Sequence, residues 1–270
     1  KATLTDFRYL RNIWRRNTEE EALLGVSLTG IMDHKILGNV SEAELEFGPN
    51  KNWLQEMRDV AIETNKVWAG KLGINQSTAI TCVKPSGTVS QLVNSASGIH
   101  PRYADFYIRR VRSDNKDPLA SFMSNRGFPV EPDVMSPQSL VFSFPVKAPK
   151  VSTSANEVTA LDQLELWKVY QNKWCEHKPS ITVYYRDDEF LEVAQWIWDN
   201  FDLCSGIALL PYSDHVYQQA PYEQITEEKY EELLAQMPKD VDWTDLEEFE
   251  TEDNTTGSQE LACVGGACEL

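Results

Sequence analysis

Short, nearly continuous apolar runs alternate with helix-like segments along most of this chain. Residues 180–185 (SITVYY) and 206–211 (GIALLP) have no regular polar face, and the segment between them, 188–201, has helical periodicity. Strands that are apolar on both faces and alternate with helices are typical of α/β folds. The pattern therefore predicts an α/β architecture whose strands are largely buried and parallel.

The same periodicities predict further elements. Residues 51–72 have one apolar face and end before Gly73, a residue suited to a helix C-cap. Apolar residues spaced three and four apart from Leu4 onward predict a helix almost at the first residue, which we expect to pack on an earlier part of a longer chain. Other helices are expected over 160–175 and 226–236, and strands over 77–83, 106–111 and 140–145.

Composition limits the partners and the compartment. A formal net charge of −17 argues against a nucleic-acid polymer, because Lys and Arg contacts with phosphates supply most non-specific affinity there. A single nucleotide is still allowed, since a few aimed amides and hydroxyls can bind its phosphates. No apolar run approaches the roughly 18 residues of a membrane helix, and no signal peptide is recognisable. We therefore expect a soluble, cytoplasmic protein with no membrane partner.

The composition changes after Pro238. Residues 239–260 are strongly acidic and have few large apolar side chains. Such a segment cannot bury enough apolar surface to offset the entropy that is lost when a chain becomes ordered. The sequence therefore predicts one domain over residues 1–238 and a flexible acidic tail over residues 239–270.

The turn after the strand at 77–83 contains residue types that suit a phosphate group. Pro85, Ser86, Gly87 and Thr88 would present backbone N–H groups and two hydroxyls at the start of a helix, and Gly87 would let an anion approach closely. Residue types alone favour the simpler alternative, an ordinary capped turn. The turn is not a P-loop, because it lacks a second glycine at that motif's spacing.

The five cysteines do not form a disulfide framework. Cys263 and Cys268 lie at the C-terminal end with a Gly-Gly pair between them, so they can close into a small disulfide ring and reopen, as a redox shuttle would. A metal-binding tail and cysteines without a role are the alternatives. Cys82, Cys175 and Cys204 are expected to be buried, unreactive thiols.

A basic segment carries Arg109, Arg110 and Arg112, with Arg102 and His100 shortly before it. One or two of these residues could face a nucleotide phosphate. Salt bridges along a strand edge are the favoured interpretation, because an acidic protein offers many carboxylate partners. The four histidines show no metal-ligand spacing, so we expect no metal site.

Several blocks of sequence, taken in order, carry a resemblance to a known family. They are ATLTDFRYL (2–10), LLGVSLTG (23–30), VKPSGTVSQL (83–92), GIHPRY (98–103), IRRVR (108–112), LLPY (209–212), QAPYE (219–223) and the Cys263/Cys268 tail. Together they resemble the C-terminal part of the adenosylcobalamin-dependent (class II) ribonucleoside-triphosphate reductases. The resemblance spans nearly the whole chain, and its most specific parts are the Pro-Ser-Gly-Thr block and the terminal cysteines.

The resemblance implies a fold and a function. The chain would form the C-terminal portion of a ten-stranded α/β barrel, in which Pro85, Ser86, Gly87 and Thr88 hold the phosphates of a ribonucleoside triphosphate. Cys263 and Cys268 would re-reduce the active-site disulfide after each turnover, and thioredoxin or a similar dithiol would restore them. The intact enzyme would use adenosylcobalamin for its radical chemistry.

The chain lacks several features of the family pattern. The Asn-Pro-Cys-x-Glu segment that supplies the radical cysteine is absent, as are the two cysteines of the active-site disulfide and the allosteric region, and none of Cys82, Cys175 and Cys204 lies in a matching motif. The chain alone is therefore expected to be inactive and to need an upstream reductase segment. Two alternatives stay open: a free-standing nucleotide-binding or metal-binding fragment, which zinc stoichiometry would reveal, and a thiol oxidoreductase, which the lack of a Cys-x-x-Cys motif disfavours.

Overall fold

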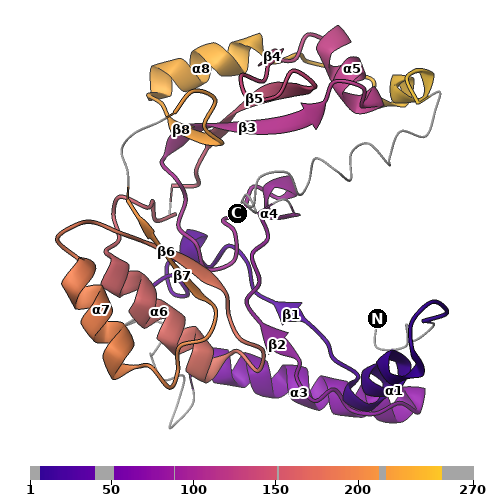
Figure 1. The fold of residues 1–270 in the computed structure, drawn as a ribbon, viewed down its shortest axis with the longest axis vertical. Helices are drawn as coiled ribbons and strands as arrows, with labels where there is room; N and C mark the ends of the chain where they lie inside the picture. Colours follow the sequence, from indigo (N-terminus) through magenta and orange to yellow (C-terminus); the bar gives the residue numbers. More distant parts are fainter. Residues whose placement is uncertain (1–6, 40–51, 88, 151, 213–216, 251–270) are drawn as a thin grey trace. The chain divides into compact units, whose positions relative to one another are not determined.

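The structure is a computed structural model with two compact units, each made of two separate stretches of chain (Figure 1). Unit 1 comprises residues 1–102 and 151–212, and unit 2 comprises residues 103–150 and 213–270. The residues that the structure describes are 7–39, 52–87, 89–150, 152–212 and 217–250.

Unit 1 contains two short pairs of parallel strands and the helices around them. Its elements are α1 (Asn12–Glu21), β1 (Val26–Ser27), the 3-10 helix η1 (Ile31–Asp33), α3 (Trp53–Leu72), β2 (Thr81–Cys82), α4 (Val89–Leu92), α6 (Ala160–Lys173), β6 (Ile181–Tyr185), α7 (Phe190–Asp199) and β7 (Ile207–Pro211). Strand β1 pairs with β2, and β6 pairs with β7 from Ile181↔Ile207 to Tyr185↔Pro211. The prediction of parallel strands with an intervening helix is confirmed here.

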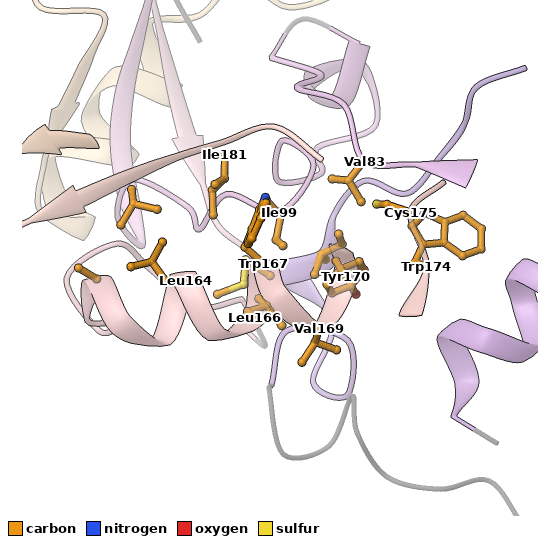
Figure 2. Close-up of a cluster of buried hydrophobic side chains, with 14 of the residues drawn as sticks. Val83, Ile99, Leu164, Leu166, Trp167, Val169, Tyr170, Trp174, Cys175 and Ile181 are labelled. Carbon is orange, nitrogen blue, oxygen red and sulfur yellow. The ribbon is translucent and has the colours of Figure 1, made fainter. Parts of the chain in front are cut away.

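Helix α6 forms the centre of the unit 1 core. Leu164, Trp167 and Tyr170 lie three residues apart on one face of the helix and are fully buried. Figure 2 shows this face within the cluster of buried apolar side chains. The Trp167 indole N–H donates to the Pro179 carbonyl at 3.2 Å, so the polar edge of the ring is satisfied inside the core. A capping box between Thr159 and Asp162 begins the helix.

Helix α3 has the predicted length, but its apolar face is largely exposed. Asn52 caps its start and Gly73, with φ of 65°, ends it as predicted. Leu54 and Ala69 are buried, whereas Val60, Val67 and Trp68 of the apolar face are exposed. A periodic pattern shows which face of a helix is apolar but not what covers it.

Unit 2 is built on an antiparallel sheet with the strand order β4-β5-β3-β8 (Figure 1). Its elements are β3 (Phe106–Asp114), α5 (Pro118–Asn125), β4 (Val130–Pro132), β5 (Ser139–Lys147), β8 (Tyr222–Gln224), α8 (Glu227–Gln236) and the 3-10 helix η2 (Trp243–Glu248). Strands β3 and β5 pair along their whole lengths, from Phe106↔Lys147 to Asp114↔Ser139.

The antiparallel sheet corrects the expectation of parallel strands for this half of the chain. Strand β3 carries Arg109, Arg110 and Arg112, so it is not apolar on both faces. A sheet with polar side chains along its strands suits antiparallel pairing, since one face can stay in contact with solvent. The described strands form two parallel pairs and one four-stranded sheet, and the ten-stranded barrel stays a prediction.

Residues 239–250, which composition predicts to be part of a flexible tail, are structured. They include η2, and Val241, Leu246 and Phe249 pack against the cluster around Phe122 of α5. The Phe122 and Phe249 rings meet edge to face at 5.6 Å between centroids. A few apolar side chains at suitable spacing are enough to hold this acidic segment on a packed surface. Residues 251–270, the rest of the predicted tail, lie outside the described part.

No helix among the described residues combines the length and the apolar character that crossing a membrane requires.

Candidate phosphate-binding site

The predicted strand, turn and helix are all present around the Pro-Ser-Gly-Thr block. Strand β2 and the following Val83 are buried, and Pro85, Ser86 and Gly87 are half-buried. Helix α4 begins at Val89 and is only four residues long. Thr88, the fourth predicted phosphate-binding residue, lies outside the described residues. Since so short a helix has little dipole, any anion held here must be bound mainly by the turn itself.

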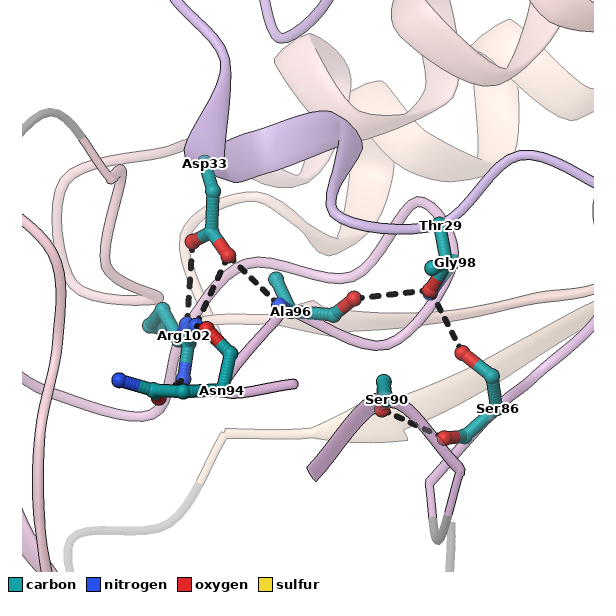
Figure 3. Close-up of polar contacts among 8 residues, drawn as sticks. All are labelled: Thr29, Asp33, Ser86, Ser90, Asn94, Ala96, Gly98 and Arg102. Carbon is teal, nitrogen blue, oxygen red and sulfur yellow. Dashed lines mark hydrogen bonds and ion pairs between the residues drawn. The ribbon is translucent and has the colours of Figure 1, made fainter. Parts of the chain in front are cut away.

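Ser86 is the best-anchored residue of the turn. Its backbone N–H donates to the Ser97 hydroxyl at 2.9 Å, and its carbonyl accepts from both the N–H and the hydroxyl of Ser90, at 2.9 and 2.5 Å. Its own hydroxyl lies 2.6 Å from Thr29 Oγ1 (Figure 3). These contacts hold the turn in place from three separate segments of unit 1.

A second loop, residues 94–98, supports the turn from one side. Thr29 joins the two, because its hydroxyl donates to the Ala96 carbonyl at 3.0 Å and accepts from the Gly98 N–H at 2.9 Å. Gly98 has φ of 54°, and a Cβ built there would lie 2.9 Å from the Lys84 carbonyl. The close approach of the two loops therefore requires glycine at this position.

The ion pair between Arg102 and Asp33 holds the second loop through hydrogen bonds to Asn94 and Ala96. Arg102, 3% exposed, donates to both carboxylate oxygens of Asp33, with Nε–Oδ1 at 3.0 Å and Nη2–Oδ2 at 2.8 Å. It also donates to the side-chain oxygen and the carbonyl of Asn94, at 3.0 and 2.5 Å. Asp33 Oδ2 accepts in addition from the Ala96 N–H at 2.6 Å. A buried pair with this many hydrogen bonds has its charges well satisfied (Figure 3).

The basic residues do not gather at one site. Arg110 pairs with Glu223 at 2.5 Å and Arg112 with Asp133 at 2.9 Å, which agrees with the favoured interpretation of salt bridges. Their strand β3 lies between β5 and β8 and is not the expected edge strand. Arg109 lies on the same strand, opposite Phe144. Arg102 belongs instead to the buried pair in unit 1, a partner that no local pattern predicts.

His100 has a structural position beside the second loop. Its Nδ1 lies 3.0 Å from the Ser97 carbonyl, and its Nε2 accepts from the Thr182 N–H at 3.0 Å. The Nδ1 atom therefore carries the proton of a neutral ring. Burial lowers the pKa of His100 below its ordinary value, which keeps the ring neutral. Within the described ranges, no group of three or more His, Cys, Asp and Glu residues could hold a metal ion.

The cysteines fall into two groups. Cys82 and Cys175 are buried, and Cys204 is half-buried. Burial raises the pKa of all three thiols, that of Cys175 to about 12, which agrees with the expectation of unreactive side chains. Cys263 and Cys268, the predicted redox pair, lie outside the described residues, so their role stays a prediction.

Sequence reasoning missed Thr29, Asp33 and Ser97 as neighbours of the turn. Thr29 bonds to Ser86 across 57 positions of sequence, and Asp33 bonds to Arg102 across 69. Only the clustering of small polar residues in 23–30 and 94–98 hinted at loops that need side-chain hydrogen bonds.

Comparison with known proteins adds relatives that match nearly the whole chain, although no family model matches it. The adenosylcobalamin-dependent ribonucleoside-triphosphate reductase of Lactobacillus acidophilus is 28% identical over 99% of the chain and 39% of its own length. The enzyme of the same name from Euglena gracilis is 31% identical over 84% of the chain and 31% of its own length.

A solved structure agrees with these relatives. The crystal structure of a B12-dependent (class II) ribonucleotide reductase matches with a TM-score of 0.71 and 25% identity, over 88% of this chain and 35% of that one. The chain spans less than two fifths of the length of the curated relatives that it matches. It is therefore a homologue of the adenosylcobalamin-dependent ribonucleoside-triphosphate reductases, and it corresponds to a part of their length.

Proposed function

We propose that this chain is part of a ribonucleotide reductase that converts ribonucleoside triphosphates to 2′-deoxyribonucleotides with adenosylcobalamin as cofactor. One observation carries the proposal: the similarity to reductases of that name covers 84–99% of the chain but only 31–39% of the relatives. The chain would act together with an upstream reductase segment, because it lacks the motif of the radical cysteine.

Within that enzyme, Pro85, Ser86, Gly87 and Thr88 would bind the substrate phosphates. The turn follows a buried strand, is half-exposed where described, and is held by side chains rather than by a long helix. Gly87 has no side chain to keep a phosphate oxygen away from the backbone. Lys84, which is exposed immediately before the turn, adds a positive charge. A pre-organised turn of this kind binds an anion without first losing backbone entropy.

The described residues do not by themselves fit adenosylcobalamin. The three described cysteines are buried or half-buried, and none lies in a motif like that of the radical cysteine. When bound to the whole enzyme, the cofactor would supply the radical. The residues of this chain would orient the substrate and deliver electrons.

Cys263 and Cys268 would deliver those electrons. Their two thiols would become a disulfide as they pass two electrons and two protons to the active-site disulfide, and a dithiol of the thioredoxin type would then reduce them. In the complete reductase, replacing both cysteines with Ser should abolish turnover driven by thioredoxin. Turnover driven by a small dithiol, which can diffuse to the active site, should largely survive. Undiminished thioredoxin-driven turnover in the double variant would contradict the shuttle role.

The phosphate role can be tested on the 270-residue chain by NMR titration with inorganic tripolyphosphate. We expect the largest amide shifts within residues 84–90 and weaker binding by the Ser86→Ala variant. Ser124→Ala is a matched control, because Ser124 is also a half-buried serine whose hydroxyl makes a hydrogen bond, in this case to the Ala120 carbonyl in α5. It should leave the affinity unchanged. Shifts confined to other segments, or equal affinity of the Ser86→Ala variant, would contradict the assignment.

A further inference from the structure

We infer that Thr29 is a positioning residue that acts through Ser86, and that the Ser86 hydroxyl anchors the turn instead of donating to the phosphate. The inference rests on the proposed phosphate role of the turn and deepens it. It follows from the three polar atoms around the Thr29 hydroxyl: the Ala96 carbonyl oxygen at 3.0 Å, the Gly98 N–H at 2.9 Å and Ser86 Oγ at 2.6 Å.

The direction of each hydrogen bond follows from the chemistry of the partners. A hydroxyl has one hydrogen and two acceptor lone pairs. The Ala96 carbonyl can only accept, so it takes the Thr29 hydrogen. The Gly98 N–H can only donate, so it occupies one lone pair of Thr29. The remaining lone pair faces Ser86, whose hydroxyl must therefore be the donor in the 2.6 Å contact.

This direction decides how the turn can bind an anion. The single hydrogen of the Ser86 hydroxyl points to Thr29, so toward a ligand its oxygen presents only lone pairs, which repel phosphate oxygens. The Ser86 N–H is also engaged, with the Ser97 hydroxyl. The contribution of the Ser86 side chain to anion binding is then indirect. Its role is to hold the turn in position.

Thr29 can do this because its own partners are held firmly. The Ala96 N–H donates to Asp33, and Asp33 pairs with the buried Arg102. The Gly30 N–H donates to the Ala96 carbonyl at 2.8 Å, beside the bond from Thr29. Gly30 has φ of 70°, and a Cβ there would overlap the Ser95 hydroxyl, so the two loops are in close contact. Together they form a rigid support for the Ser86 hydroxyl.

The two possible roles of Ser86 make opposite predictions for Thr29→Val. If Ser86 anchors the turn, the variant removes the acceptor for its hydroxyl, and we expect tripolyphosphate to bind about 3- to 10-fold more weakly, the loss of one hydrogen bond. If Ser86 instead donates to the phosphate, the variant frees its hydrogen and binding becomes tighter. Thr29→Ser keeps the hydroxyl and should bind within about twofold of the unchanged chain.

A double-mutant cycle separates the positioning role from a general loss of structure. Thr29→Val combined with Ser86→Ala should bind no more weakly than the weaker single variant, because both remove the same contact. Ser97→Ala gives an independent check, since it removes the acceptor of the Ser86 N–H and should also weaken binding. Thermal unfolding of each variant shows whether the chain is folded at the assay temperature.

The outcomes distinguish the inference from the function on which it rests. If the unchanged chain does not bind tripolyphosphate, the phosphate role and the inference both fail. If the unchanged chain binds tripolyphosphate but Thr29→Val binds it equally or more tightly, the inference alone is overturned. The same holds if the losses of affinity from Thr29→Val and Ser86→Ala multiply in the double variant.

Discussion

Both units have an arginine–aspartate pair that joins distant segments, Arg102–Asp33 in unit 1 and Arg126–Asp245 in unit 2, and these two pairs lie in different surroundings. Unit 2 also has the pair Arg112–Asp133. In unit 1 the side chains of Arg102 and Asp33 are 2% and 13% exposed, and both make further hydrogen bonds. In unit 2, Arg126, which follows α5, pairs with Asp245 of η2, and these side chains are 39% and 36% exposed. A buried pair determines where its loops lie, whereas an exposed pair contributes little because water screens it.

The difference follows from how each unit is built. Unit 2 has a long antiparallel ladder of backbone hydrogen bonds between β3 and β5, to which the ion pairs of Arg110 and Arg112 are added. Beside the proposed phosphate turn, the described part of unit 1 has only the two-residue parallel pair of β1 and β2. Hydrogen bonds donated by the side chains of Thr29 and Arg102, and one accepted by the Ser97 hydroxyl, take the place of a ladder there. Loops that present a site are thus held by side chains where the sheet is minimal.

Removal of the buried arginine tests this comparison most strongly. Arg102→Met leaves Asp33 buried without its partner and should lower the free energy of unfolding by about 3–5 kcal/mol. Arg126→Met removes the exposed pair and should cost about 1 kcal/mol or less. Urea unfolding combined with hydrogen exchange of peptides from each unit would measure both, since two units need not unfold together. Equal losses for the two variants would contradict the proposed difference.

Two glycines with positive φ provide the next test. Gly98→Ala adds a Cβ close to the Lys84 carbonyl, so strain and overlap together should cost about 2–4 kcal/mol. Gly127, with φ of 82° in unit 2, has no described atom within 4 Å of the point where a Cβ would lie, and Gly127→Ala should cost only the strain of about 1–2 kcal/mol. Thermal unfolding would compare them. A Gly127→Ala variant that is the less stable of the two would show that the loops of unit 1 are not closely packed.

The smallest effect concerns the pH dependence of unit 1. Burial lowers the pKa of His100 in the folded chain below its ordinary value of 6.5. Below pH 6.5 the unfolded chain therefore binds a proton at His100 more readily than the folded chain does. Stability is therefore fully present above that pH and is lost as the pH falls from it toward the lowered pKa. Urea unfolding at about pH 7.5 and about pH 5.5, on either side of the ordinary value, should show this loss, and His100→Gln should make the slope smaller. An unchanged slope in the variant would mean that other groups cause the pH dependence.

The sequence by itself determined the elements whose causes are local. Gly73 ends α3 as predicted, and the apolar runs that become β6 and β7 are parallel strands with a helix between them. The strand, turn and helix around residues 85–87 were also predicted, because glycine, proline and periodicity act through near neighbours in the chain. The resemblance to the reductases was equally visible in the order of short motifs.

Only the tertiary structure decided which segments meet. The antiparallel pairing of β3 with β5 brings together residues as distant in sequence as Phe106 and Lys147. The Thr29–Ser86 and Asp33–Arg102 contacts join residues 57 and 69 positions apart. No periodicity encodes such partners, because the free energy of a hydrogen bond depends on burial and geometry after folding and not on spacing along the chain. The strand, turn and helix around residues 85–87 were therefore predictable from residue types, and the hydrogen bonds that support Ser86 were not.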